Sequence, residues 1–214
     1  MLANTAINTQ RETFRESDVV RVHGIISNGG ASVNAIPGEV IYDGRVRAKS
    51  IETLEPIAEK VIRCYRAGAL AMGASVEVQS IAGYHGLVQD PTMQKLFVDN
   101  AELVLGRDSI SVVGTSQTHG GSTDMGDLST IMPVIHPYAN SASGVGHGND
   151  YLIEDYDRAV VAPAKVMTAT VLDLLGNDAQ AAREALAKSK PAMTAEQYVS
   201  VQRGRFKTEL FEQS

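Results

Sequence analysis

The chain contains one cysteine and no tryptophan, and aromatic residues make up only 5% of its 214 residues. The single thiol, Cys64, excludes an intrachain disulfide and any metal site built from several cysteines of this chain. Cys64 falls within an apolar pattern of helical spacing, which favours an inert core thiol over a reactive one.

Positive charge and long apolar runs are also scarce. Lysine and arginine total 19 against 25 acidic residues, so the formal net charge is -6, and the sequence pI is about 5.4. This balance gives no electrostatic reason to expect nucleic-acid binding. No apolar run reaches the roughly 18 residues of a membrane span, and the sequence does not open on a charged and then apolar leader. We therefore expect a cytoplasmic protein without nucleic-acid or membrane partners.

The common catalytic signatures are missing as well. The sequence contains no HExxH, GxSxG or GxGxxG pattern, no paired cysteines, no HxD pair and no Glu-Glu pair. A hydrolase with two metal ions needs several carboxylate and histidine ligands gathered at one site. This chain alone is short of such ligands.

The first part of the chain, residues 1–87, alternates between helical and strand patterns. It predicts two helices and three strands, over residues 2–16 (helix), 19–27 (strand), 39–48 (strand), 50–72 (helix) and 75–81 (strand). A split β-α-β-β-α-β sandwich has this order once a strand is added in front. We therefore expect an incomplete ferredoxin-like domain, and a chain that starts partway through a larger protein.

The second part, residues 88–214, is richer in helical patterns. It predicts one short strand among four helices, over residues 90–106 (helix), 109–114 (strand), 155–175 (helix), 178–188 (helix) and 194–212 (helix). Together the two parts predict an α/β chain.

A glycine-rich stretch over residues 119–151 holds three of the five histidines. His147 stands among glycines in GVGHGNDY, where a histidine is exposed unless something binds it. Imidazole suits zinc, manganese or cobalt, so His147 is a candidate metal ligand, with a solvated loop residue as the alternative. His136, which precedes Pro137, favours a structural role.

The turn GGSTDMGD, in the same stretch, offers backbone N–H groups, two hydroxyls and two carboxylates. Such a turn can wrap an anion or a carboxylate in a nest of amides. The other interpretation is a plain turn. It is not a nucleotide-binding P-loop, because no GK[ST] follows.

Asn34 and Arg47 of the first part could grip a carboxylate if they face the same side, whereas His23 could belong to the core or project toward a partner surface. His23 lies in mid-strand, Asn34 lies in the loop before Ile36 and Pro37, and Arg47 ends the next strand. Arginine offers a bidentate fork to carboxylates. Taken singly, each residue is a weak signal, since surface arginines and loop asparagines are common.

Two stretches together carry a family resemblance. VRVHGIISNGGASVNAIPGEVIYDGRVRAKS is similar to the lid domain of the co-catalytic zinc aminoacylase and carboxypeptidase family. GGSTDMGDLSTIMPVIHPY, followed by GHGNDY, resembles the last part of the catalytic domain of that family. The nearest branch comprises amidohydrolases acting on aminobenzoyl-glutamate, N-acyl amino acids and related dipeptides. The resemblance covers roughly residues 1–175.

The resemblance implies a role for each candidate residue. His147 aligns with the last metal ligand, and His23 aligns with the lid histidine that reaches the active site of the dimer partner and polarises the scissile carbonyl. The lid residues that hold the substrate carboxylate correspond to Asn34 and Arg47. The substrate-side loop of the catalytic domain corresponds to Gly121, Ser122, Thr123 and Asp124. The remaining ligands and the general base of the family lie before the lid and have no counterpart here.

The sequence therefore predicts two incomplete domains. Residues 1–87 would be a lid or dimerisation domain of ferredoxin-like fold without its first strand, and residues 88–214 the C-terminal part of an α/β zinc-hydrolase domain. The intact enzyme would be a homodimer that binds two divalent metal ions, zinc above manganese or cobalt, and cleaves amide bonds of N-acyl amino acids or small dipeptides. The isolated chain would be inactive. The alternative is a non-enzymatic ferredoxin-like dimerisation or small-molecule-binding module.

Overall fold

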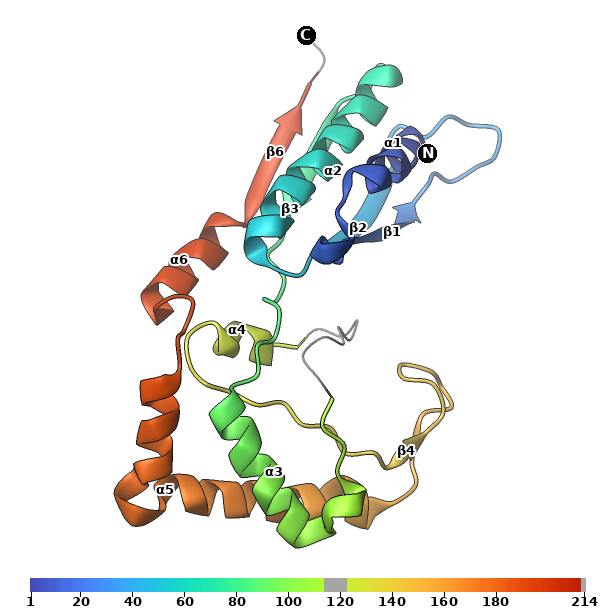
Figure 1. Cartoon of the computed structure of the whole chain (residues 1–214). Coiled ribbons are helices and arrows are strands. Elements are labelled where there is room, and N and C mark those ends of the chain that lie inside the picture. The colour runs from blue at the N-terminus through green and yellow to red at the C-terminus, as the bar shows by residue number, and fades with distance from the viewer. Residues whose placement is uncertain (114–122, 213–214) are drawn as a thin grey trace. The chain divides into compact units, whose positions relative to one another are not determined.

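The computed structural model describes residues 1–113 and 123–212, which divide into two compact units (Figure 1). Unit 1 combines Met1–Gly83 with Val201–Ser214, and unit 2 comprises Tyr84–Ser200. Both helices and strands are present, so the predicted α/β class is confirmed.

Unit 1 is a layer of helices on a layer of strands. Its elements are α1 (Leu2–Gln10), two 3-10 turns (Arg11–Thr13 and Glu16–Asp18), β1 (Arg21–Asn28), β2 (Ile41–Arg47), α2 (Ile51–Ala71), β3 (Val76–Ser80) and β6 (Lys207–Phe211). The predicted cap of α2 is confirmed, because Ser50 Oγ accepts a hydrogen bond from the Thr53 N–H at 3.3 Å. The first predicted helix is shorter than expected and gives way to the 3-10 turns.

The core of unit 1 lies between α1, α2 and the β1–β2 pair. Its buried residues are Ile7, Val22, Val61 and Cys64, with Val46 and Tyr65 among those packed against them. Cys64 is 5% exposed, in agreement with an inert core thiol. Val22 and Val46 are directly opposite each other across the β1–β2 ladder, so the same face of both strands is directed at the helices.

The strands of unit 1 form two separate antiparallel pairs. β1 pairs with β2, with a register shift between Ile26 and Asn28, and β3 pairs with β6. A single ferredoxin-like sheet is therefore not present in the described part of the chain.

The C-terminal strand β6 corrects the sequence prediction of one helix over residues 194–212. The helix, α6 (Ala195–Gly204), ends early, and Lys207–Phe211 forms a strand against β3. Residues 207–211 read KTELF, in which the less exposed residues are Glu209 and Phe211. This period of two is that of a half-buried strand, and it was masked by the polar character of the whole segment.

Unit 2 is mainly helical. Its elements are α3 (Pro91–Leu105), a 3-10 turn (Arg107–Ser109), α4 (Met125–Ser129), β4 (Ala142–Ser143), β5 (Leu152–Ile153), a π-helical turn (Asp157–Val161), α5 (Ala162–Lys188) and most of α6. Asp90 caps α3 by accepting hydrogen bonds from the N–H groups of Thr92 and Met93, both at 2.9 Å. The predicted strand over 109–114 is wrong, since residues 110–113 have no regular structure and residue 114 lies outside the described part.

Helix α5 bends sharply in its second half. Asn177, Asp178 and Ala179 have positive φ angles of 48°, 57° and 55°, which separate two helical segments. The sequence predicted this break between residues 175 and 178.

The stretch Asp157–Lys188 is long and apolar enough to span a membrane by length and composition, with a mean hydropathy of 1.5 over 18 residues, of which 11% are buried. Helices of soluble proteins can meet the same test, so it assigns no membrane location.

Candidate functional site

The face of the β1–β2 pair that is turned away from the helices carries a cluster of basic side chains. Arg21 lies opposite Arg47, and His23 lies opposite Arg45, in the antiparallel register. Val22 and Val46 alternate with these residues and enter the core, so all four basic residues lie on the other face. Asp43 shares this face and is its acidic member. We call these five residues the basic strand face.

The basic strand face brings together two residues singled out from the sequence. His23 is exposed, Arg47 is partly buried, and the two are diagonal neighbours on adjacent strands. Such diagonal pairs are about 7–8 Å apart, within reach of a long side chain. One small anion could therefore contact both side chains.

Sequence reasoning missed Arg21 and Arg45 as members of this face. Their signal was present in the alternation itself, because Arg21-Val22-His23 and Arg45-Val46-Arg47 each repeat a basic residue at a period of two. Like charges that face each other across a ladder are destabilising. A face that keeps them is suited to a negatively charged ligand.

Asn34 lies in the loop that joins β1 to β2. Its side chain is exposed, and Ser32 Oγ donates a hydrogen bond to Asn34 Oδ1. Gly30 stands in the same loop with a φ of 108°, packed against the ring of Pro37. A side chain at Gly30 would collide with Pro37, so the glycine and the proline together shape the loop that carries Asn34.

Two candidate residues of unit 2, Thr123 and Asp124, lie directly before α4. Thr123 Oγ1 donates to Asp124 Oδ1 at 3.1 Å, while Gly121 and Ser122 lie outside the described residues. α4 is fixed to the segment before α3: Asp127 Oδ1 accepts a hydrogen bond from the His85 N–H at 2.7 Å. Gly126 is so close to the same segment that an added Cβ would lie 2.0 Å from the His85 carbonyl oxygen.

His85 is another residue that sequence reasoning did not single out. The residue is 9% exposed, and its ring packs edge-on against Tyr198, with ring centroids 5.6 Å apart. This location between α4 and α6 indicates a structural role. The surroundings of His136 also indicate a structural role. Its ring lies edge-on to that of Tyr138, with centroids 5.1 Å apart, and its backbone N–H donates to Gln89 Oε1 at 3.0 Å.

His147 lies in the connection between β4 and β5, which pair as a hairpin. Its side chain is exposed, and its backbone is left-handed with a φ of 67°. The loop is tightened around Asp150, whose Oδ1 accepts a hydrogen bond from the Val145 N–H at 3.3 Å. Non-glycine residues rarely adopt this conformation, and such outliers concentrate at functional sites.

The described residues do not assemble a complete metal site. No group of three or more His, Cys, Asp and Glu side chains suitable for a metal ion occurs within residues 1–113 and 123–212. His147 thus has no set of co-ligands in this part of the chain. A metal pair would need ligands from elsewhere.

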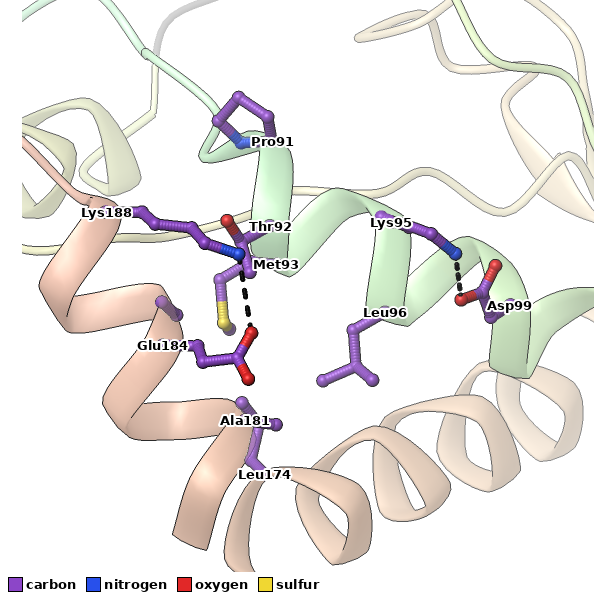
Figure 2. A pocket seen from close by; sticks show the side chains of 11 residues that line it. Pro91, Thr92, Met93, Lys95, Leu96, Asp99, Leu174, Ala181, Glu184 and Lys188 are labelled. Atoms are coloured by element: carbon purple, nitrogen blue, oxygen red, sulfur yellow. Dashed lines mark hydrogen bonds and ion pairs between the residues drawn. The ribbon is translucent and has the colours of Figure 1, made fainter.

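A separate hollow of about 470 Å³ lies between α3 and α5 (Figure 2). Leu96, Leu174 and Met93 give it an apolar lining. At its rim, each lysine is paired with an acid of its own helix: Lys95 with Asp99 at 2.6 Å, and Lys188 with Glu184 at 3.4 Å. None of the candidate residues lines this hollow.

Comparison with known proteins relates the chain to hydrolases. No known family model matches it. Xaa-Arg dipeptidase of Mus musculus is 32% identical over 183 residues, which are 82% of this chain and 41% of the relative. Xaa-Arg dipeptidase of Homo sapiens is 34% identical over 163 residues, which are 72% of this chain and 37% of the relative.

A third relative, an uncharacterized hydrolase of Sinorhizobium fredii, is 28% identical over 110 residues, or 51% of this chain and 26% of the relative. The chain is related to peptidases and hydrolases. It spans about two fifths of the length of the dipeptidases that it matches. The comparisons do not single out the amidohydrolase branch expected from the sequence.

Proposed function

We propose that this chain is part of a metal-dependent peptidase that cleaves the amide bond of small dipeptides. The observation that carries this proposal is the similarity to two Xaa-Arg dipeptidases over 82% and 72% of the chain. Dipeptides that end in arginine are therefore the first substrates to test. N-acyl amino acids, which contain the same amide bond beside a free carboxylate, are the second.

The basic strand face supplies a binding rationale for such substrates. The free carboxylate of a dipeptide is a planar anion, which the guanidinium of Arg47 can hold through two parallel hydrogen bonds. Asn34 lies in the loop at the other end of the β1–β2 hairpin, away from Arg47, so it would reach the same carboxylate only from a partner subunit. His23, diagonal to Arg47, would then lie on the side of the scissile carbonyl, where a donor stabilises developing negative charge.

In this proposal, the metal belongs to the whole enzyme. A divalent ion, when bound, polarises a carbonyl and lowers the pKa of water. His147 would contribute one ligand, and the other ligands and the general base would come from polypeptide beyond these 214 residues. Zinc fits an imidazole ligand best, with manganese and cobalt as alternatives. By itself, the chain would not hydrolyse dipeptides.

We further propose that the enzyme is cytoplasmic and acts as a homodimer joined through unit 1. The exposed position of His23 supports this arrangement, since a side chain on an open strand face is accessible to the substrate of a partner subunit. The non-enzymatic binding module is not favoured, because the relatives with assigned activity are dipeptidases.

The test compares the 214-residue chain with the longest protein encoded around it. Both are assayed on alanyl-arginine and on N-acetyl-arginine, and zinc is quantified after gel filtration. We expect hydrolysis only by the longer protein. His147→Ala should lower its zinc content, whereas Asn149→Ala, on the same hairpin loop, should not. Zinc that is unchanged in His147→Ala would remove the residue from the metal site, and absence of hydrolysis by the longer protein would overturn the proposed activity.

A further inference from the structure

The loop that joins β1 to β2 begins directly after Asn28, with Gly29 and Gly30. Every residue from 28 to 40 is exposed to solvent. The last pair of the β1–β2 ladder is Asn28 with Ile41, so Gly29 lies beyond the ladder. A register shift between Ile26 and Asn28 interrupts the ladder at this end. Water therefore reaches Asn28, and the backbone that follows it is not constrained by strand pairing.

An asparagine followed by a glycine is a chemically reactive pair. The backbone nitrogen of the second residue can attack Cγ, the side-chain amide carbon of the asparagine, because this closes a five-membered ring. Glycine carries no Cβ, so its nitrogen approaches without hindrance and its backbone rotates freely. Asn28 is the one asparagine of the sequence that precedes a glycine.

Gly30 places a hydrogen-bond donor on the atom that becomes charged in such an attack. Its backbone N–H donates to Asn28 Oδ1 at 3.3 Å. This oxygen gains negative charge when Cγ is attacked, and a donor already directed at it lowers the barrier. Gly30 is held in place by a φ of 108° and by the ring of Pro37, which fills the space that a Cβ would need. The loop thus supplies the attacking nitrogen and stabilises the developing charge.

A second pair, Asp43 and Gly44, has the same sequence signature, because an aspartate can form the same ring. Gly44 pairs with Gly24 in the middle of the β1–β2 ladder. A Cβ added at Gly44 would lie 2.6 Å from the Tyr65 hydroxyl, so the backbone is also enclosed from the helix side. Strand pairing and packing keep this backbone from rotating into the attacking geometry. The structure therefore separates two pairs that the sequence does not.

We propose that Asn28 is a site of non-enzymatic deamidation. The Gly29 nitrogen forms a bond to Asn28 Cγ and gives its proton to water, and the side-chain nitrogen leaves as ammonia. Water then opens the cyclic imide at one of its two carbonyl carbons. Attack at Cγ breaks the new bond and leaves aspartate. Attack at the main-chain carbonyl carbon of residue 28 leaves isoaspartate, in which the backbone runs through Cβ and Cγ.

The conversion changes the loop in two ways. It adds a carboxylate to a chain whose formal net charge is already -6. In the isoaspartate product, it also lengthens the backbone by one methylene group at the point where β1 enters the loop. Asn34 lies six residues further along the same loop. The charge and the spacing of the segment that carries Asn34 thus change as the protein ages.

Peptide mass spectrometry of the full 214-residue chain tests the proposal. The folded chain is kept in mildly alkaline buffer, and samples are digested with trypsin over time. Cleavage after Arg21 and Arg45 releases residues 22–45 as one peptide, which contains Asn28, Asn34 and Asp43. We expect acid to appear at Asn28 about tenfold faster than at Asn34, which precedes alanine in the same exposed loop. Asp43 should remain a normal aspartate.

Gly29→Ala should slow the conversion of Asn28 about tenfold, because the added Cβ hinders the attacking nitrogen. The fold tolerates this change, since the new methyl group meets only Ile26 Cγ2, at 3.3 Å. Gly38→Ala is the matched control in the same loop. An added Cβ meets nothing within 4 Å there, so Asn28 should convert at the parent rate.

Three results would overturn the proposal. The first is equal conversion of Asn28 and Asn34, and the second is an unchanged rate in Gly29→Ala. The third is conversion of Asn28 in the urea-unfolded chain without conversion in the folded chain, since the folded loop would then protect the site.

Discussion

His23 of β1 lies directly opposite Arg45 of β2 and diagonal to Arg47, on the face of the strands that is turned away from the helices. This relationship joins the one histidine of the basic strand face to two guanidinium groups. It predicts that the three residues act on one anionic ligand and that their contributions separate into binding and rate.

Replacing His23 by alanine in the whole enzyme should lower kcat far more than it raises KM. A single oxyanion donor contributes about 10²–10³ in rate, and binding of the carboxylate by Arg47 is unaffected. Steady-state kinetics on a dipeptide measure both constants. Ile25→Ala, an exposed change on the same strand face, serves as the control. A change in KM alone would remove His23 from the proposed role.

Replacing Arg47 by methionine should raise KM about tenfold or more for substrates with a free carboxylate, since a charge-assisted bidentate pair is lost. For substrates whose terminal carboxylate is amidated, KM should be similar in the parent enzyme and in the variant. The ratio of kcat/KM for the acid and the amide is the quantity to compare between the parent and the variant. An unchanged ratio would show that Arg47 does not bind the substrate carboxylate.

Gly126→Ala should destabilise unit 2, because the new methyl group would lie 2.0 Å from the carbonyl oxygen of His85. Overpacking of this kind costs about 1–3 kcal/mol. Urea unfolding measures the loss. Gly146→Ala, where an added Cβ meets nothing within 4 Å, is the matched control and should stay within about 0.5 kcal/mol of the parent. Equal stability of the two variants would contradict the close packing of α4 on the His85 segment.

Tyr65 should make stability depend on alkaline pH. Burial, with smaller contributions from Tyr42 and Cys64, raises the pKa of Tyr65 to about 12. Unfolding returns this pKa to about 10, so the unfolded chain releases its proton first and the folded state loses stability as pH rises from 10 to 12. The urea midpoint between pH 9 and pH 11.5 should therefore fall less in Tyr65→Phe than in the parent chain. Parallel profiles in the two proteins would exclude this contribution.

The parts of the fold that local patterns dictate were predictable from the sequence. Helix α2 has a serine cap and apolar residues at helical spacing, so its start at Ile51 and its end near Ala71 match the prediction. The alternation in β1 and β2 was also predictable, and with it the common face of His23 and Arg47.

The features that depend on distant partners were not predictable. β6 becomes a strand because β3 offers it an edge, and its own five residues are too polar to indicate a strand. Residues 110–113 have the β-branched composition of a strand but pair with nothing in the described chain. His85 was overlooked because its position between Asp127 and Tyr198 arises from segments that lie far apart in the sequence.

The pairing of β3 with β6 has a consequence for how the chain folds. Unit 1 takes its strands from segments that lie far apart in the sequence, so β6 must leave the ribosome before β3 can acquire this neighbour. Contacts that span so much of the chain slow folding, because a long loop must close before they form. During synthesis, β3 is a bare edge that other chains can reach. A fusion partner inserted directly after Phe211 would be attached to a structural strand.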